Sequence, residues 1–261
     1  MMQSFGFAFL VTLLTGLATG IGGLFSFFVK KNDFRLLSFI MGFSGGVMIY
    51  VSLTALIPEG FELLAKAMDP LKALWITLFS LGLGAAAMVL VDCFFPEQIL
   101  DDEVKNTFQP NQKLLLKSGL TVAFLLALHN LPEGLSTFIS FLSGLDVSYP
   151  IALSMALHNI PEGVAVCLPV YFLTKSATKS FFVALLSGFI EPLGALMGYF
   201  LFLPFIKSGL IGLVFTFAGG MMVFVSFKAL YPVLKQGAEA FSGTIGLLLA
   251  AMVSALLFLF F

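Results

Sequence analysis

The sequence predicts an all-α polytopic membrane protein with eight transmembrane helices, and three observations support this fold class. Hydrophobic residues make up 59% of the 261 residues and charged residues only 10%, whereas soluble domains contain roughly 25% charged residues. The chain divides into eight mostly apolar segments, each long enough to supply the ~20 residues that a helix needs to cross a bilayer. These segments lack a two-residue alternation of polar and apolar side chains, so helices are expected rather than a β-barrel.

Short loops join the predicted spans, with one exception. We expect the spans at residues 5–29, 36–64, 73–95, 117–142, 149–173, 179–203, 209–233 and 242–261, in a single transmembrane domain of residues 1–261. The second is longer than a bilayer requires, so it should tilt or extend beyond the membrane. The exception is the polar segment 96–116, predicted to be a loop because Pro96, Pro110 and Asn111 oppose a helix there. Its acidic residues 101–103 are interpreted as solvated linker rather than a cation-capture site.

The distribution of lysine and arginine predicts the orientation of the chain. With eight spans, both termini lie on one side, whose loops hold three such residues, Lys66, Lys72 and Lys207. The loops on the other side hold nine: Lys30, Lys31, Arg35, Lys105, Lys113, Lys117, Lys175, Lys179 and Lys235. Positively charged loops remain in the cytoplasm, so we expect both termini outside and the 96–116 loop in the cytoplasm. A net charge of −1 without a basic patch predicts no nucleic-acid partner.

A repeated motif carries the strongest functional indication. The segment ALHNLPEG at 127–134 returns as ALHNIPEG at 156–163, and the only two histidines of the chain, His129 and His158, occupy the same place in each copy. Both copies lie inside predicted spans. An ionisable residue at that depth costs about 2.5–3.5 kcal/mol or more, so its presence there indicates a function.

A second repeat flanks the first and suggests transport. Residues 45–58 (GGVMIYVSLTALIP) resemble residues 219–232 (GGMMVFVSFKALYP), and these stretches fall on the second and seventh spans. The chain is therefore interpreted as spans 1–3 and 6–8 related by inversion around an inverted pair, spans 4 and 5. Inverted repeats with polar residues near the midplane are typical of transporters. Glycine-rich patches in the spans, such as Gly82 with Gly84, are interpreted as close helix packing.

Helical geometry places the polar residues of each motif on one face. With about 100° per residue, Glu133 lies between His129 and Asn130 around the fourth span, and Glu162 repeats this arrangement on the fifth. If the two faces meet, a pair of His–Glu groups adjoins a pair of Asn–Glu groups, which gives two neighbouring metal positions that both glutamates can bridge. Pro132 and Pro161 each free a backbone carbonyl one turn earlier, as a proline within a helix does.

The donor set predicts the class of ion. Imidazole with carboxylate suits zinc, iron(II), manganese, cobalt and nickel, whereas copper(I) would require thiolates or methionines. Cys93 and Cys167 are interpreted as buried free thiols rather than as a disulfide or a metal site.

Four further charged side chains fall in or near the predicted spans. Glu191, followed by a proline in the sixth span, is expected beside the Asn–Glu position. Glu59 and Glu62, at the end of the second span, either line the outer part of a metal path or lie in the interface. Lys228 in the seventh span either pairs with a carboxylate or extends to the cytoplasmic edge, and we expect the latter.

At these residues the chain resembles the ZIP (Zrt/Irt-like protein) family of divalent metal transporters, and it is most similar to the bacterial zinc-uptake branch. The resemblance covers all eight spans, and HNLPEG, HNIPEG and SGFIEPLG are its most specific parts. It implies an eight-helix fold in a cell membrane, such as the bacterial inner membrane, a homodimer, and transport by alternating access. It also implies a binuclear centre: one position with His129, Glu133, His158 and Glu162, and another with Asn130, Glu133, Asn159, Glu162 and Glu191.

The chain departs from the pattern of related bacterial proteins at two places. Relatives often carry an acidic residue where this chain has Ala55, and an acidic or His-Glu pair where it has Lys228 and Ala229. Both changes remove negative charge and put a peripheral relay of metal in doubt. The 96–116 loop also lacks a histidine-rich tract.

Two enzymatic interpretations compete with transport. An intramembrane zinc protease would require HExxH, but asparagine follows each histidine here. A di-iron carboxylate enzyme uses Glu-x-x-His, whereas this chain has His-x-x-x-Glu. The sequence therefore favours uptake of a divalent metal, zinc first, with Fe²⁺, Mn²⁺, Co²⁺ and Cd²⁺ as further candidate substrates, over a membrane-embedded metalloenzyme.

Overall fold

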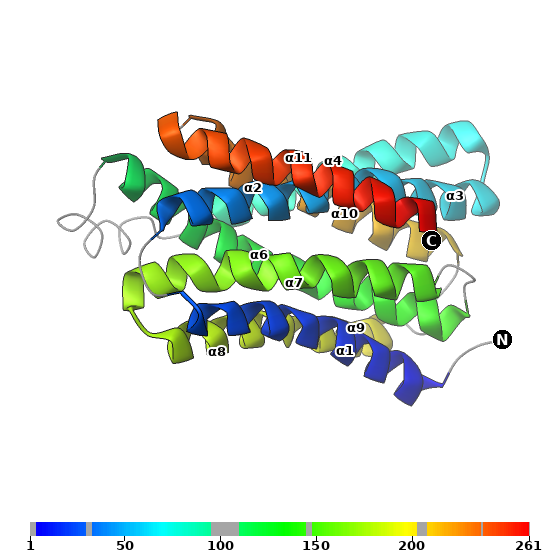
Figure 1. Ribbon diagram of the computed structural model, residues 1–261. Helices are drawn as coiled ribbons and strands as arrows, with labels where there is room; N and C mark the ends of the chain where they lie inside the picture. The colour runs from blue at the N-terminus through cyan, green and yellow to red at the C-terminus, as the bar shows by residue number, and fades with distance from the viewer. Residues whose placement is uncertain are drawn as a thin grey trace.

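The computed structural model describes residues 4–29, 33–94, 110–144, 148–202, 208–235 and 237–260, and its described elements are all helices (Figure 1). In chain order these are α1 (Phe5–Gly23), the 3₁₀ helix η1 (Leu24–Phe27), α2 (Phe34–Val51), the π-helix η2 (Ser52–Leu56), α3 (Ile57–Ala67), α4 (Pro70–Phe94), α6 (Pro110–Ser143), α7 (Ser148–Thr174), α8 (Ala177–Gly188), α9 (Ile190–Phe202), α10 (Ser208–Lys235) and α11 (Gly237–Phe260).

Eight helical runs match the eight predicted spans. Seven are long and apolar enough to cross a membrane, and α11 supplies a shorter apolar stretch, Ala240–Leu256. Large apolar side chains of α4 point away from the protein, with Trp75 65% and Phe79 72% exposed, which suits a lipid environment and not water. The prediction of an all-α polytopic membrane protein is confirmed.

Two spans depart from regular α-helix directly before a proline. The second span runs from Phe34 to Ala67, and its π-helical turn η2 precedes Pro58, which has no amide hydrogen for the carbonyl of Thr54. The sixth span breaks at Phe189, between α8 and α9, and Pro192 follows. The great length of the second span agrees with expectation, whereas neither irregularity was predicted.

The last seven residues of the polar segment 96–116, predicted to be a loop, are helical. Helix α6 begins at Pro110, so residues 110–116 are helical, and the expectation that Pro110 opposes a helix is wrong. A proline at the first helical position is favourable, because its missing amide hydrogen would have no partner there in any case. The acidic residues 101–103 lie outside the described residues.

Helix contacts follow the inverted relation that the sequence predicts. In Figure 1, α2, α3, α4, α10 and α11 lie together, and α1, α6, α7, α8 and α9 form the other group. Within the first group α11 packs on α2 as α4 packs on α10, and within the second α1 packs on α7 as α9 packs on α6. If span 1 is exchanged with span 6, span 2 with 7, span 3 with 8 and span 4 with 5, each of these contacts becomes the other contact of its pair.

Glycines allow the closest of these contacts. A side chain at Gly16 would collide with the backbone of Gly188, one at Gly134 with the carbonyl of Glu191, and one at Gly163 with the carbonyl of Thr19. The interpretation of the glycine-rich patches as packing surfaces is confirmed at Gly16, and at Gly84, where a side chain would collide with the carbonyl of Phe217. Gly82 is an exception, because nothing lies within 4 Å of a Cβ built there.

Candidate metal centre

The seven side chains predicted as ligands all lie inside the protein. His129, Asn130 and Glu133 project from α6, and His158, Asn159 and Glu162 project from α7. Glu191 stands at the start of α9, directly after the break in the sixth span. His158 is 2% exposed and the others are 0% exposed. Three glutamates and two histidines withdrawn this far from water require compensating partners.

Both histidine rings lie close to the same carboxylate oxygen. The Nε2 atom of His129 lies 3.4 Å from Oε1 of Glu133, and the Nε2 atom of His158 lies 3.1 Å from the same oxygen. The first pair belongs to one turn of α6, and the second crosses from α7 to α6. The structure therefore brings the faces of the two motif helices together.

The other nitrogen of each ring sets the tautomer. Nδ1 of His129 lies 2.6 Å from the carbonyl oxygen of Leu126, and Nδ1 of His158 lies 3.1 Å from that of Ser154. A carbonyl oxygen only accepts, so the proton of each neutral ring lies on Nδ1 and Nε2 carries a lone pair. Two nitrogen lone pairs then face one carboxylate oxygen. Such a contact is repulsive unless a proton or a metal ion lies between the atoms.

Glu162 completes a compact donor cluster with the α6 residues. One ligand atom from each of His129, Glu133 and Glu162 lies within 4.8 Å of the other two. His158 reaches this cluster through Glu133. Eleven buried side-chain nitrogen or oxygen atoms in the described residues have no hydrogen-bond partner, and six of them belong to the predicted ligands. Unpartnered buried polar atoms are rare in native proteins, and their concentration here fits a site for a cation.

The asparagines use their nitrogen atoms elsewhere and leave their oxygen atoms open. Nδ2 of Asn130 donates to the carbonyl and hydroxyl oxygens of Ser187, at 3.2 and 3.3 Å. Nδ2 of Asn159 donates to the carbonyl oxygen of Thr15, at 2.9 Å, and to Oε1 of Glu191. Oδ1 of both asparagines is buried without a partner. Each amide is therefore held so that only its oxygen can bind an ion.

Glu191 is held from two sides by residues of different helices. Asn159 of α7 binds Oε1, and the hydroxyl of Thr15 on α1 donates to Oε2 at 2.7 Å. Glu191 thus lies beside Asn159, where the sequence places it. Thr15 and Ser187 were not predicted, because single hydroxyl residues are common in apolar helices and nothing in their own pattern distinguishes them.

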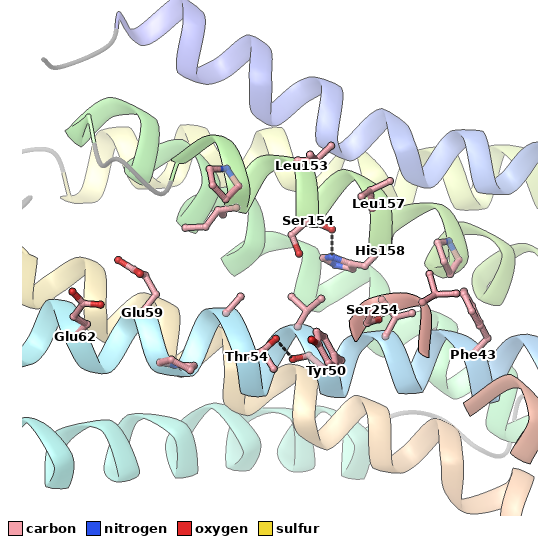
Figure 2. Close-up of a pocket in the computed structure, with 18 residues that line it drawn as sticks. Phe43, Tyr50, Thr54, Glu59, Glu62, Leu153, Ser154, Leu157, His158 and Ser254 are labelled. Carbon is pink, nitrogen blue, oxygen red and sulfur yellow. Dashed lines mark hydrogen bonds between the residues drawn. The ribbon is translucent and has the colours of Figure 1, made fainter. Parts of the chain in front are cut away.

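A cavity of about 410 Å³ adjoins the cluster and reaches Glu59 and Glu62. Figure 2 shows the two glutamates on α3 toward one end of the cavity and His158 on α7 facing Tyr50 and Thr54. Glu59 is half-buried and Glu62 is exposed. These two glutamates and His158 therefore line one continuous space.

Comparison with known proteins decides the family. A family model described as ZIP Zinc transporter matches residues 102–259. Zinc transporter ZupT of Streptococcus mutans serotype c is 40% identical over 99% of this chain and 100% of the relative. The Zinc transporter ZupT proteins of Clostridium perfringens (97% of this chain, 95% of the relative) and Corynebacterium aurimucosum (97% of each) are both 38% identical. The chain belongs to the ZIP zinc transporter family.

Membership in the ZIP family settles two of the sequence-based interpretations. The resemblance to its bacterial zinc branch is confirmed by relatives that match over nearly the whole chain. Because ZIP proteins are transporters, the alternative of a membrane-embedded metalloenzyme is wrong.

Lys228, at a departure from the ZIP pattern, forms an ion pair. Nζ of Lys228 on α10 lies 2.6 Å from Oδ2 of Asp92 on α4, and both side chains are partly buried. The structure thus shows the pairing with a carboxylate, which was the less expected of the two alternatives for Lys228. A partly buried carboxylate at this distance offers the ammonium group a stronger interaction than the interface does.

The two cysteines are both free thiols, as the sequence predicts. Cys167 is buried, but Cys93, near the end of α4, is exposed, so the prediction of burial is wrong for Cys93.

Proposed function

We propose that this protein carries divalent metal, zinc first, across the cell membrane into the cytoplasm. The observation that supports this most is the convergence of two imidazole Nε2 atoms on one carboxylate oxygen of Glu133 in a buried cluster. A divalent ion between these atoms would turn their mutual repulsion into coordination. Zinc is the substrate named for the relatives, and imidazole with carboxylate is a donor set that suits it. Fe²⁺, Mn²⁺, Co²⁺ and Cd²⁺ are further candidate substrates.

The site is proposed to hold two ions. The nitrogen-containing position would use His129, Glu133, His158 and Glu162. The all-oxygen position would use the same two glutamates together with Asn130, Asn159 and Glu191. The open Oδ1 atoms of both asparagines and the unpartnered carboxylate oxygens of Glu133 and Glu162 support this division.

The cavity is proposed as the route by which metal reaches the site. Glu59 and Glu62 would attract cations at its outer end, and His158, which lines the same cavity, would receive them. The lysine and arginine distribution supports an external location for this end. The direction of transport is then inward.

Movement of one helix group against the other would expose the site to each side in turn. All proposed ligands of the two positions belong to α6, α7 and α9, which lie in the group with α1 and α8 (Figure 1). The other group, with α2, α3, α4, α10 and α11, provides the opposite wall of the cavity through α2, η2, α3 and α11. An inverted repeat supports such alternating access. We expect the transporter to act as a homodimer.

Zinc uptake by proteoliposomes tests the proposal. The His129→Ala, His158→Ala double variant should lose at least about 100-fold in initial uptake rate, because outer-shell changes alone cost metal sites 10–100-fold. Thr77→Val is a matched control, since Thr77 is buried in α4 of the other group, and its uptake should equal that of the unaltered protein. Unchanged uptake in the double variant would show that metal does not pass through this site.

A further inference from the structure

Thr19 of α1 has a buried hydroxyl with no partner. Its side chain is 0% exposed and Oγ1 makes no hydrogen bond. Several threonines in the helices donate to the carbonyl one turn back, as Thr12 does to Ala8 and Thr216 does to Gly212. The corresponding acceptor for Thr19 is the carbonyl of Thr15, which already accepts from Asn159. An unpartnered buried hydroxyl costs about 1–3 kcal/mol, a cost that a bound ion would offset.

The inverted relation makes Thr19 the counterpart of Glu191. Residues 15–22 read TGLATGIG and residues 187–194 read SGFIEPLG, which pairs Thr15 with Ser187 and Thr19 with Glu191. A side chain built at Gly16 would lie 3.4 Å from Cβ of Glu191, and one at Gly188 would lie 3.0 Å from Cβ of Thr19. The two Cβ atoms therefore occupy equivalent places beside the crossing of α1 and α8.

Contacts with the motif helices repeat this equivalence. Gly134 of α6 packs against the backbone of Glu191, and Gly163 of α7 packs against the backbone of Thr19. Each glycine directly follows a proposed ligand, Glu133 or Glu162. Thr15 also faces the site, since its hydroxyl binds Glu191. Thr19 lies four residues later, about 40° away on the same helix face.

Resting on the proposed function, we propose that the Thr19 hydroxyl is a sixth oxygen donor of the all-oxygen position. This position then has three pairs of groups related by the inversion: Asn130 with Asn159, Glu133 with Glu162, and Glu191 with Thr19. Six oxygen donors favour octahedral coordination and suit Mn²⁺, whereas the position with two imidazoles suits Zn²⁺. Thr19 accordingly tunes which ion the second position holds.

Metal binding to the purified protein tests this assignment. Thr19→Val should weaken Mn²⁺ binding about tenfold and leave the tighter Zn²⁺ site unchanged, whereas Thr19→Ser should bind both ions as the unaltered protein does. Thr77→Val is the matched control, because Thr77 also has a buried hydroxyl without a partner. If the Thr19 hydroxyl had no ligand, Thr19→Val and Thr77→Val would both be at least as stable as the unaltered protein, and both would bind Mn²⁺ as tightly as it does. Normal Mn²⁺ binding by Thr19→Val would therefore show that the proposal is wrong.

A thiol at the same place provides a spectroscopic test that does not depend on the valine variant. With Co²⁺ added, Thr19→Cys should show a thiolate-to-cobalt charge-transfer absorption in the near ultraviolet. The unaltered protein, which already has Cys93 and Cys167, and Thr77→Cys should not show it. Absence of this absorption from Co²⁺-loaded Thr19→Cys would place residue 19 outside coordination distance and overturn the proposal.

The same titrations separate this inference from the proposed function. If the His129→Ala, His158→Ala protein binds Zn²⁺ and Mn²⁺ as the unaltered protein does, the whole metal site fails. If that protein loses Zn²⁺ while Thr19→Val keeps Mn²⁺, only the role of Thr19 fails.

Discussion

At the scale of single residues, Glu133 holds the centre together. Its Oε1 lies within 3.4 Å of Nε2 of both His129 and His158, and its other oxygen has no partner. An anionic oxygen between two imidazoles attracts a divalent ion more strongly than a neutral amide oxygen of the same shape does. Glu133 therefore matters more for its charge than for its packing.

Glu133→Gln should separate charge from shape. The amide nitrogen can donate to a bare Nε2, so the fold should be retained, while Zn²⁺ affinity and uptake should fall at least about 100-fold. Equilibrium zinc binding and proteoliposome uptake measure the two effects, with thermal unfolding as the check on folding. Binding and uptake within a factor of two of the unaltered protein would show that Glu133 is not a ligand.

Sequence reasoning located the motif residues but not their supports. His129 and His158 stand out because they are the only histidines and occupy identical repeats. Thr15 and Ser187 touch the site from α1 and α8, yet hydroxyl residues in apolar helices have many ordinary uses. Only the relation between the first and sixth spans identifies them, and that relation becomes clear once the contacts are known.

At the scale of helices, glycines set how closely α1 and α9 approach the motif helices. A Cβ at Gly163 would collide with the carbonyl of Thr19, and a backbone atom cannot move aside as the end of a side chain can. The helices would have to separate at the point where the proposed ligands lie.

Gly163→Ala should therefore lower the free energy of unfolding by about 1–3 kcal/mol, as overpacking typically does, and should weaken metal binding as well. Gly82→Ala is the control, because nothing lies within 4 Å of a Cβ there. Thermal unfolding of the two purified variants checks this. Equal stabilities would mean that the close approach is not required.

The ion pair between Lys228 and Asp92 joins α10 to α4 within the other group. Removing one partner leaves the other charge partly buried, so Lys228→Met should destabilise the protein by about 1.5–3 kcal/mol, the usual contribution of a hydrogen bond to a charged group. The Lys228→Met, Asp92→Asn double variant should recover most of this loss. Thermal unfolding of both variants tests the coupling, which is absent if the double variant is no more stable than the single one.

Irregular helical turns and contacts between distant helices could not be predicted from local sequence patterns. Pro58 follows a π-turn at Ser52–Leu56 and Pro192 follows a break at Phe189, whereas Pro132 and Pro161 lie within continuous helices. A proline alone therefore does not predict which span becomes irregular, because this depends on the packing around it. The pairing of Lys228 with Asp92 depends on which helices become neighbours, and the order of the spans along the chain does not show this.

At the scale of the whole molecule, transport should depend on pH with a defined sign. Protons compete with metal for imidazole nitrogens and carboxylates, so metal binding requires these groups in their unprotonated forms. Acidification of the outer medium should reduce uptake, and steeply, because several ligands must lose protons together. Zinc uptake at a series of external pH values checks this, and a rate that stays constant or rises with acidification would contradict it.

The inverted relation between the spans could be predicted from the sequence, whereas the division of the helices into two groups was not predicted. The repeat of residues 45–58 in residues 219–232 indicated the inversion, and the exchange of helix contacts agrees with it. The cavity that joins Glu59 and Glu62 to His158 could not be predicted, because its walls come from both groups and from helices far apart in the chain.

The most direct test of the central claim, that α6 and α7 together surround a metal ion, is X-ray absorption at the zinc edge of the zinc-loaded, tag-free protein. Since His129 and His158 are the only histidines, any imidazole scattering from the metal must come from them. The account predicts nitrogen and oxygen neighbours at about 2.0–2.2 Å with an imidazole contribution that disappears in the His129→Ala, His158→Ala protein. Zinc without imidazole neighbours, or with a sulfur shell, would contradict it.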